Sequence, residues 1–212
     1  MRKLLPIAVL SVLLVTSCEN FFTNSPFSAF RRDPASMSEA QKQAFARDVL
    51  ASGDRAAMEE AYNDLKESED PETQLLAADL AIGAVGLDSA FIGAVGDLES
   101  GADAEATIDA AIESFEDDDF TMLAEAAALV DEADASSTPT PEQYLYAAVA
   151  MIAVAANQNG GATGLDSSHD PAVETSVTQA QEFLDAAYAG LQAAGESTEL
   201  LDSLGAGIGW TP

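Results

Sequence analysis

The chain has little of the residue types that usually carry covalent chemistry. Its 212 residues include one cysteine, one histidine and one tryptophan. A single cysteine cannot form an internal disulfide. A nucleophile needs a nearby base, and the only histidine that could serve is His169. These absences make an enzyme that uses a nucleophile and a histidine base a remote expectation.

Basic residues are also scarce, and all eight Lys and Arg lie at or before Lys66. From Glu67 to Pro212 there are 29 Asp and Glu residues and no Lys or Arg. Proteins bind nucleic acid by neutralising its phosphates with Lys and Arg, so nucleic acid is not expected as a partner.

The formal net charge of −29 leaves three interpretations. The surface is adapted to salt or to plain solubility, or it docks a basic partner or a cation, or the chain is disordered. A hydrophobic content of 48% is enough to build a core, which argues against disorder.

Signals for β-strands are nearly absent, whereas helix starts and stops recur along the chain. Ser38 with Gln41 has the form of a capping box, and Gly53 stands where the first helix should stop. A capping residue followed by proline, the order that a helix start prefers, occurs at Asp70-Pro71, Thr140-Pro141 and Asp170-Pro171. These signals predict an all-α fold.

The N-terminal apolar run from Leu4 to Val15 is too short to span a membrane, which takes roughly 18 to 20 residues. Arg2 and Lys3 precede it, and the small residues Thr16 and Ser17 follow it. This order of charge, apolar run and small residues predicts a removable export signal over residues 1–17.

The segment Val15-Thr16-Ser17-Cys18 resembles the lipobox of bacterial lipoproteins, in which Leu or Val and two small residues precede a cysteine. The resemblance implies that the Cys18 thiol carries a diacylglyceryl group, that the leader is cut before Cys18, and that the new amino terminus is acylated. Two or more acyl chains anchor a protein stably on a membrane without crossing it. The alternative is an ordinary signal peptide with an accidental cysteine.

The lipoprotein resemblance places the mature protein in a bacterial cell envelope. In the enterobacterial sorting pattern an aspartate after the lipidated cysteine marks retention in the inner membrane, and this chain has Glu19 there. The outer membrane, facing the periplasm, is therefore favoured, and the extracellular face of the cell membrane is the other expectation.

Residues 18–35 are predicted to be an extended lipidated tether, and residues 36–212 a helical-repeat domain. In the domain, first helices are expected near 38, 71, 104 and 141, and second helices near 54, 88, 120 and 171. The spacing matches a two-helix unit of about 34 residues. Because one hairpin cannot bury its own apolar face, the period predicts an α-α superhelix of about four stacked helical hairpins.

The first unit resembles the tetratricopeptide repeat (TPR) family. Phe45 and Ala46 stand at the family's Leu-Gly pair, and Gly53-Asp54 resembles its Gly-Asp turn. Met58, Tyr62 and Leu65 match the core positions of the family's second helix. Asp70-Pro71 resembles its closing Asp-Pro, displaced by about one residue. Later units keep the period and lose most of the signature. The resemblance implies recognition of a peptide or helix from an envelope partner.

Four local features add expectations about packing. Gly86 is predicted to end a helix and Gly93 to allow two helices to approach closely. Tyr144 to Ala156 is uninterruptedly apolar, which predicts a buried central helix. The amphipathic segment from Pro171 to Ala194 is expected to flank it.

Two polar segments contain side chains that could form a site. His169 follows Asp166-Ser167-Ser168 and precedes Asp170, but the plain interpretation is that Asp170 caps a helix and His169 faces water. Asp117 to Asp119 could offer oxygens to a hard cation, but lacks the ligand spacing of an EF-hand. It is interpreted as a turn in which Asp119 caps the next helix.

The glycine-rich end, Gly205 to Gly209, lacks the strand-to-helix context of a phosphate loop. Trp210 is expected to dock this tail into a groove. No catalytic, cofactor-binding or metal-binding residue is assigned, and Cys18 is the one modification site.

The leading hypothesis from the sequence is a non-enzymatic, membrane-anchored envelope lipoprotein that acts as a helical-repeat scaffold or protein-binding module. Its acidity favours a basic partner, since opposite charge steers association. The alternative is a small-ligand or cation-binding accessory lipoprotein associated with a transporter.

Overall fold

The computed structural model describes residues 36–99 and 104–212. The chain divides into two units, Met1–Met37 and Ser38–Pro212. The expected export signal (1–17), the lipidation site Cys18 and the tether (18–35) lie outside the described residues.

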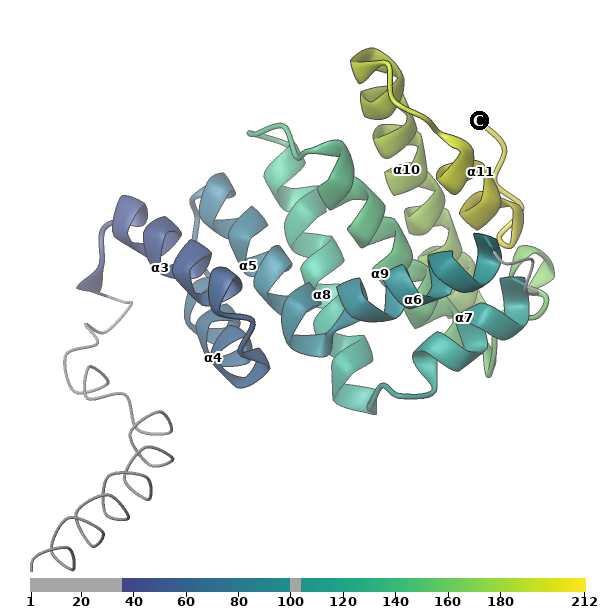
Figure 1. Ribbon diagram of the computed structural model, residues 1–212, viewed down its shortest axis with the longest axis horizontal. Coiled ribbons are helices and arrows are strands. Elements are labelled where there is room, and N and C mark those ends of the chain that lie inside the picture. The colour runs from purple at the N-terminus through teal and green to yellow at the C-terminus, as the bar shows by residue number, and fades with distance from the viewer. Residues whose placement is uncertain (1–35, 100–103) are drawn as a thin grey trace, which may run out of the picture. The chain divides into compact units, whose positions relative to one another are not determined.

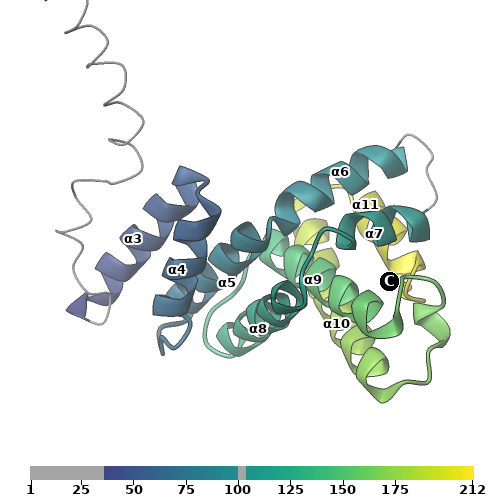
Figure 2. The same ribbon diagram turned by 90° about the horizontal axis from the view of Figure 1, so that it is seen from below.

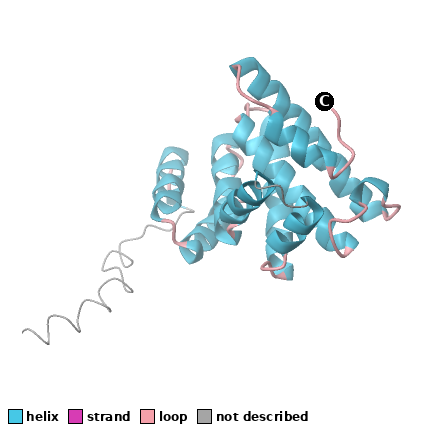
Figure 3. Cartoon of the chain, turned by 45° about the vertical axis from the view of Figure 1, so that its right-hand side comes forward, coloured by secondary structure: helices cyan, strands magenta, loops and turns pink. Residues whose placement is uncertain are grey.

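The all-α prediction is confirmed, since the described residues form helices joined by loops and contain no strand (Figure 3). In chain order the helices are α3 (Glu39–Ser52), α4 (Arg55–Leu65), α5 (Pro71–Val85), α6 (Leu87–Glu99), α7 (Ala104–Ile112), α8 (Asp117–Asp134), α9 (Pro141–Asn159), the short 3-10 helix η3 (Leu165–Ser167), α10 (Pro171–Ala194) and α11 (Glu199–Ala206).

The helix starts follow the capping residues that the sequence predicted. Ser38 and Gln41 form the capping box of α3. The Asp70 carboxylate accepts from the Thr73 amide at 2.9 Å at the start of α5, and the Asp170 carboxylate accepts from the Ala172 amide at 2.9 Å at the start of α10. Each bond satisfies one of the amides that a helix start leaves without an intrahelical partner.

The start of α8 differs from the expectation. Asp119 was predicted to cap this helix, but Glu116 is the N-cap and α8 begins at Asp117. The Asp119 carboxylate accepts from the Glu116 amide at 2.8 Å, so Asp119 is the third helical residue of a capping box. Three acidic residues in the first turn also suit the positive end of the helix dipole.

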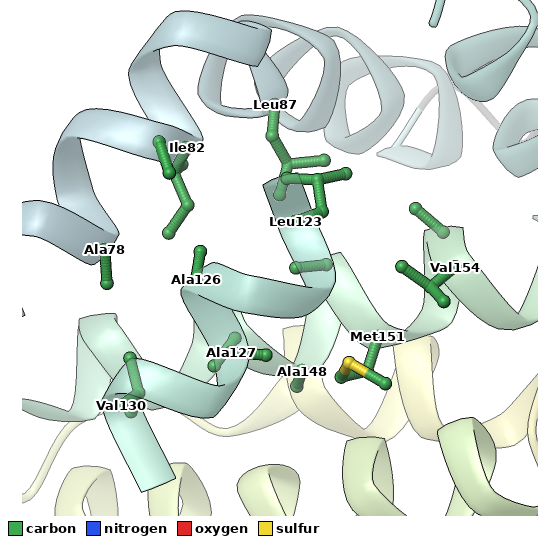
Figure 4. Packing of buried hydrophobic residues seen from close by; sticks show 14 of the residues in the cluster. Ala78, Ile82, Leu87, Leu123, Ala126, Ala127, Val130, Ala148, Met151 and Val154 are labelled. Carbon is green, nitrogen blue, oxygen red and sulfur yellow. The ribbon is translucent and has the colours of Figure 1, made fainter. Parts of the chain in front are cut away.

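The core lies where α8 and α9 pack side by side, with α5 against α8 and α10 against α9 (Figure 1). Figure 4 shows Ala126 and Ala127 of α8 between Ala78 of α5 and Ala148 of α9. The predicted central helix is confirmed, since α9 is buried from Ala150 to Ala156. Small side chains on these helices allow the backbones to approach closely.

Helix α5 does not pair mainly with α6, the helix that follows it in the chain. The chain bends by 66° between α5 and α6, where Gly86 adopts a left-handed conformation with φ of 79° and ends α5 as predicted. After the bend α6 packs mainly on α7, while α5 packs mainly on α8 (Figure 2). Helices α3 with α4 and α9 with α10 remain neighbours both in the chain and in space.

The prediction for Gly93 is wrong. A Cβ at Gly93 would meet no atom within 4 Å, so nothing packs closely there. The close approach occurs ten residues earlier, where a Cβ at Gly83 would lie 2.7 Å from the Met58 sulfur. The two glycines occur in repeated strings, but Gly83 faces α4 across a packed contact, whereas Gly93 is exposed on α6.

The C-terminal tail is docked, as predicted for Trp210. This side chain is 6% exposed, and its indole N–H donates to the Asp185 carboxylate on α10 at 2.8 Å. The indole packs on Tyr188 edge to face and covers Gly205, where a Cβ would lie 2.2 Å from the ring.

Among the helices of residues 36–99 and 104–212, none has by itself both the length and the apolar composition of a membrane span. The bent pair Pro71–Val85 and Leu87–Gly96 meets the length and composition test when its two halves are taken together.

Candidate functional site: an acidic cleft between α5 and α9

A cleft of about 430 Å³ opens beside the N-terminal turn of α9. Its lining comes from the end of α3, the middle of α4 and α5, the start of α6 and the start of α9. The lining residues are Leu50, Met58, Asp79, Ile82, Gly83, Asp88, Thr140, Glu142, Gln143 and Tyr146. Three of them are acids and none is Lys, Arg or His.

Asp79 is the acid with the most perturbed environment. It stands on α5 between Ala78 and Leu80, which are both inaccessible to solvent, and is itself partly buried. Its carboxylate accepts from the Gln143 side chain on α9 at 3.2 Å. Burial raises the pKa of Asp79 from 3.8 to about 6, against the opposing effect of the Gln143 hydrogen bond, and the nearby Glu142 raises it further.

The rim carries two more carboxylates, each in the first turn of its helix. Asp88 belongs to the first turn of α6 and Glu142 to the first turn of α9, where the helix dipole stabilises negative charge. Tyr146 is one turn beyond Glu142 on α9. Burial raises the pKa of Tyr146, and the charges of Glu142, Asp88 and Asp79 add to the effect.

The apolar part of the lining comes from α3, α4 and α5. Met58 and Ile82 belong to the core cluster, and Leu50 is a partly buried residue packed against that cluster. The cleft thus combines an apolar surface with a partly buried carboxylate in one hollow. The guanidinium of Arg55 lies against Gly86 at the end of α5, outside the lining.

A second polar cluster joins α4 to α8. Lys66 donates to the Glu125 carboxylate at 2.8 Å, and the Tyr62 hydroxyl donates to the same carboxylate. The hydrogen bonds from Lys66 and Tyr62 lower the pKa of Glu125, while burial and the contact with Glu125 raise the pKa of Tyr62. Because Glu125 on α8 accepts from Lys66 and from Tyr62 on α4, these bonds link the two helices, and the Glu125 charge is already paired with a cation.

A further hollow of about 400 Å³ lies between α7, the start of α8 and the end of α9. Asp109 and Glu113 of α7 and Asp117 of α8 are among its lining residues. The Asp109 carboxylate is engaged, since it accepts from the Ala162 amide at 2.6 Å. Over residues 36–99 and 104–212 no group of three or more His, Cys, Asp or Glu could hold a metal ion.

The structure separates the polar segments that the sequence singled out. His169 is exposed beside the helix start capped by Asp170, as the plain interpretation predicted. Asp117 to Asp119 form the first turn of α8. Cys18 lies outside the described residues.

Sequence reasoning missed the cleft, although one of its residues left a signal. Asp79 is the one acid within the apolar run from Leu75 to Val85, and an acid on an otherwise buried helix needs a reason to be there. Its partners Gln143 and Glu142 are more than sixty residues further along, so the sequence period could not place them beside it.

The lining suits the binding of a cation. The carboxylates can attract and hold a positively charged group, Gln143 can orient one, and Tyr146 offers an aromatic ring to a cation.

Comparisons of the chain with protein-family models, with curated proteins and with solved structures found no match.

Proposed function

We propose that this chain is a membrane-anchored envelope lipoprotein whose helical-repeat domain acts, without enzymatic activity, as a scaffold that binds a basic protein partner. The observation that carries the proposal is the cleft of about 430 Å³, whose lining includes three carboxylates and an apolar surface but no Lys or Arg. A partner that presents Lys or Arg would complement this charge.

The distribution of charge along the chain supports a basic partner. Within Ser38–Pro212 the bases are Lys42, Arg47, Arg55 and Lys66, which all precede α5. Every helix from α5 onward therefore adds negative charge without compensation. Such a field raises the rate at which a positively charged partner meets the protein, and salt weakens it.

Partner binding is tested by affinity capture from the native envelope with a matched variant. The triple variant Asp79→Asn, Asp88→Asn and Glu142→Gln removes the charge of the cleft while keeping similar side-chain volumes. We expect the wild-type domain to retain a basic protein that the triple variant loses. Equal capture by both, or no protein above background with either, would contradict the proposal.

The anchor is tested separately at Cys18. The Cys18→Ser variant is expected to leave the membrane fraction, and mass spectrometry of the wild-type mature chain should show acyl groups on residue 18. A wild-type chain that retains residues 1–17, or that carries a free thiol at Cys18, would refute the lipoprotein assignment.

A further inference from the structure

We propose that the cleft between α5 and α9 holds one arginine side chain of the partner, with the guanidinium at Asp79 and the aliphatic stem against Leu50, Met58 and Ile82. The inference rests on the proposed function, because it names the chemical group that the basic partner inserts.

The composition of the lining suits a long side chain with a polar end. The cleft volume of about 430 Å³ lies in the range of about 300–1,000 Å³ typical of sites for compact ligands. Apolar atoms of Met58 and Ile82 share the hollow with the Asp79 carboxylate. Arg and Lys carry an apolar stem below their charge, so they can satisfy both parts of such a lining at once.

The Asp79 carboxylate has unused capacity for hydrogen bonds. Gln143 donates to one of its two oxygens, Oδ2, at 3.2 Å. A carboxylate accepts at both oxygens and takes two parallel bonds from a guanidinium. A bound arginine would therefore pair the charge that burial on α5 disfavours.

The spacing of the acids favours a broad cation over a metal ion. In the described part of the chain, no three acids lie close enough together to form a metal-ligand set. A guanidinium carries five N–H donors in a planar fork and reaches acceptors that a single ion cannot. Its flat face also stacks on an aromatic ring, which Tyr146 supplies at the wall.

Occupancy should depend on pH through Asp79, because a protonated carboxyl no longer attracts a cation. The other titratable groups of the lining are Glu142 and Tyr146 on α9 and Asp88 on α6, while the Arg55 guanidinium lies at Gly86, further along α5 and outside the lining. The lining residues from α3 and α4, Leu50 and Met58, carry no charge. Since burial raises the pKa of Asp79 to about 6, binding is expected to weaken about tenfold between pH 7.5 and pH 5.

The test uses three short peptides of Gly and Ser that differ at one central residue, which is arginine, its neutral isostere citrulline, or lysine. Isothermal titration calorimetry with the full mature chain, at low salt and pH 7.5, measures the affinity of each peptide. We expect the arginine peptide to bind at least about tenfold more tightly than the citrulline peptide, as charge-assisted hydrogen bonds predict. The lysine peptide should bind more weakly than the arginine peptide.

The matched variants locate the binding. Asp79→Asn should abolish the preference for arginine over citrulline, whereas Glu132→Gln on the exposed surface of α8 should leave it in place. Asp88→Asn at the rim serves as a second cleft variant and should reduce the preference. Circular dichroism of each variant confirms that the helices remain folded.

Equal binding of the arginine and citrulline peptides, or an arginine preference that survives Asp79→Asn in a folded variant, would overturn the inference. Lysine binding equal to that of arginine would also overturn it. These failures would leave the proposed function intact if a basic partner were still captured in a way that depends on the cleft acids. Conversely, tight arginine binding without any captured partner would refute the proposed function alone.

Discussion

Replacing Asp79 by asparagine should stabilise the domain at neutral pH and leave its stability unchanged in acid. The folded state raises the pKa of Asp79 from 3.8 to about 6, so the folded protein holds this proton more tightly than the unfolded chain. Above about pH 6 the carboxyl is ionised in both states, and the folded state bears the cost of burying the charge. Below about pH 4 the carboxyl is protonated in both states, and that cost vanishes.

The size of the effect follows from the shift in pKa. A shift of about two units corresponds to roughly 3 kcal/mol at 1.36 kcal/mol per unit, which is an upper limit because the side chain is only partly buried. We therefore expect Asp79→Asn to raise the free energy of unfolding by about 1 to 3 kcal/mol at pH 8. The asparagine carbonyl can still accept from Gln143, so the contact between α5 and α9 is retained.

Urea unfolding followed by far-ultraviolet circular dichroism, at intervals from pH 4 to pH 8, measures the difference. In the wild type this carboxyl should lower stability as pH rises from about 4 to 6, and the variant should lack that contribution. Glu132→Gln, which removes one exposed charge from α8, controls for the change in net charge. A variant that is less stable than the wild type at pH 8, or a difference of equal size at pH 4 and pH 8, would refute the reasoning.

Four further substitutions test packing and pairing. Gly93→Ala should stabilise the domain by up to about 1 kcal/mol in thermal unfolding, since a Cβ there has open space in α6. Gly190→Ala should instead destabilise the domain by about 1 to 3 kcal/mol, because a Cβ there would lie 2.6 Å from the rigid ring of Pro141. Equal effects of Gly93→Ala and Gly190→Ala on the melting temperature would contradict this packing argument. Glu125→Gln should lower stability by no more than about 1 kcal/mol at pH 7, since the carboxylate is exposed. Because pairing lowers the pKa of Glu125, this difference should disappear in urea unfolding as pH falls toward 3, and a difference that persists there would count against the pairing. Trp210→Phe should cost about 1 to 2 kcal/mol through loss of the indole hydrogen bond, measured by circular dichroism, and an unchanged melting temperature would argue against a docked tail.

Local signals in the sequence predicted the helices well, because capping acts within one turn. Asp70, Thr140 and Asp170 cap helices at the predicted places, since side-chain oxygens bond to amides two or three residues away. The misplaced start of α8 shows the limit of this reasoning. Four consecutive acids could each have served as the cap, and the reciprocal bond between Glu116 and Asp119 decided which one did.

Pairing between helices was harder to predict, because a repeat period gives the spacing of elements and not their neighbours. The bend at Gly86 turns α6 away from α5, and α5 packs against α8 instead. The cleft depends on this rearrangement together with the approach of α9. Asp79 could have been singled out as an acid in an apolar run, but the residues around it come from four other helices.

The contact of α8, α9 and α10 is built largely from alanine, including Ala126, Ala148, Ala155 and Ala180, each with no exposed surface. A methyl group has no rotamer to change, so neighbouring backbones must themselves move when such a side chain grows. Shortening a leucine elsewhere leaves a hole that surroundings can partly fill. Over generations of random change, these alanine positions should therefore accept glycine or serine far more readily than valine or leucine, and the spacing between the helices should outlast most of the surface around them.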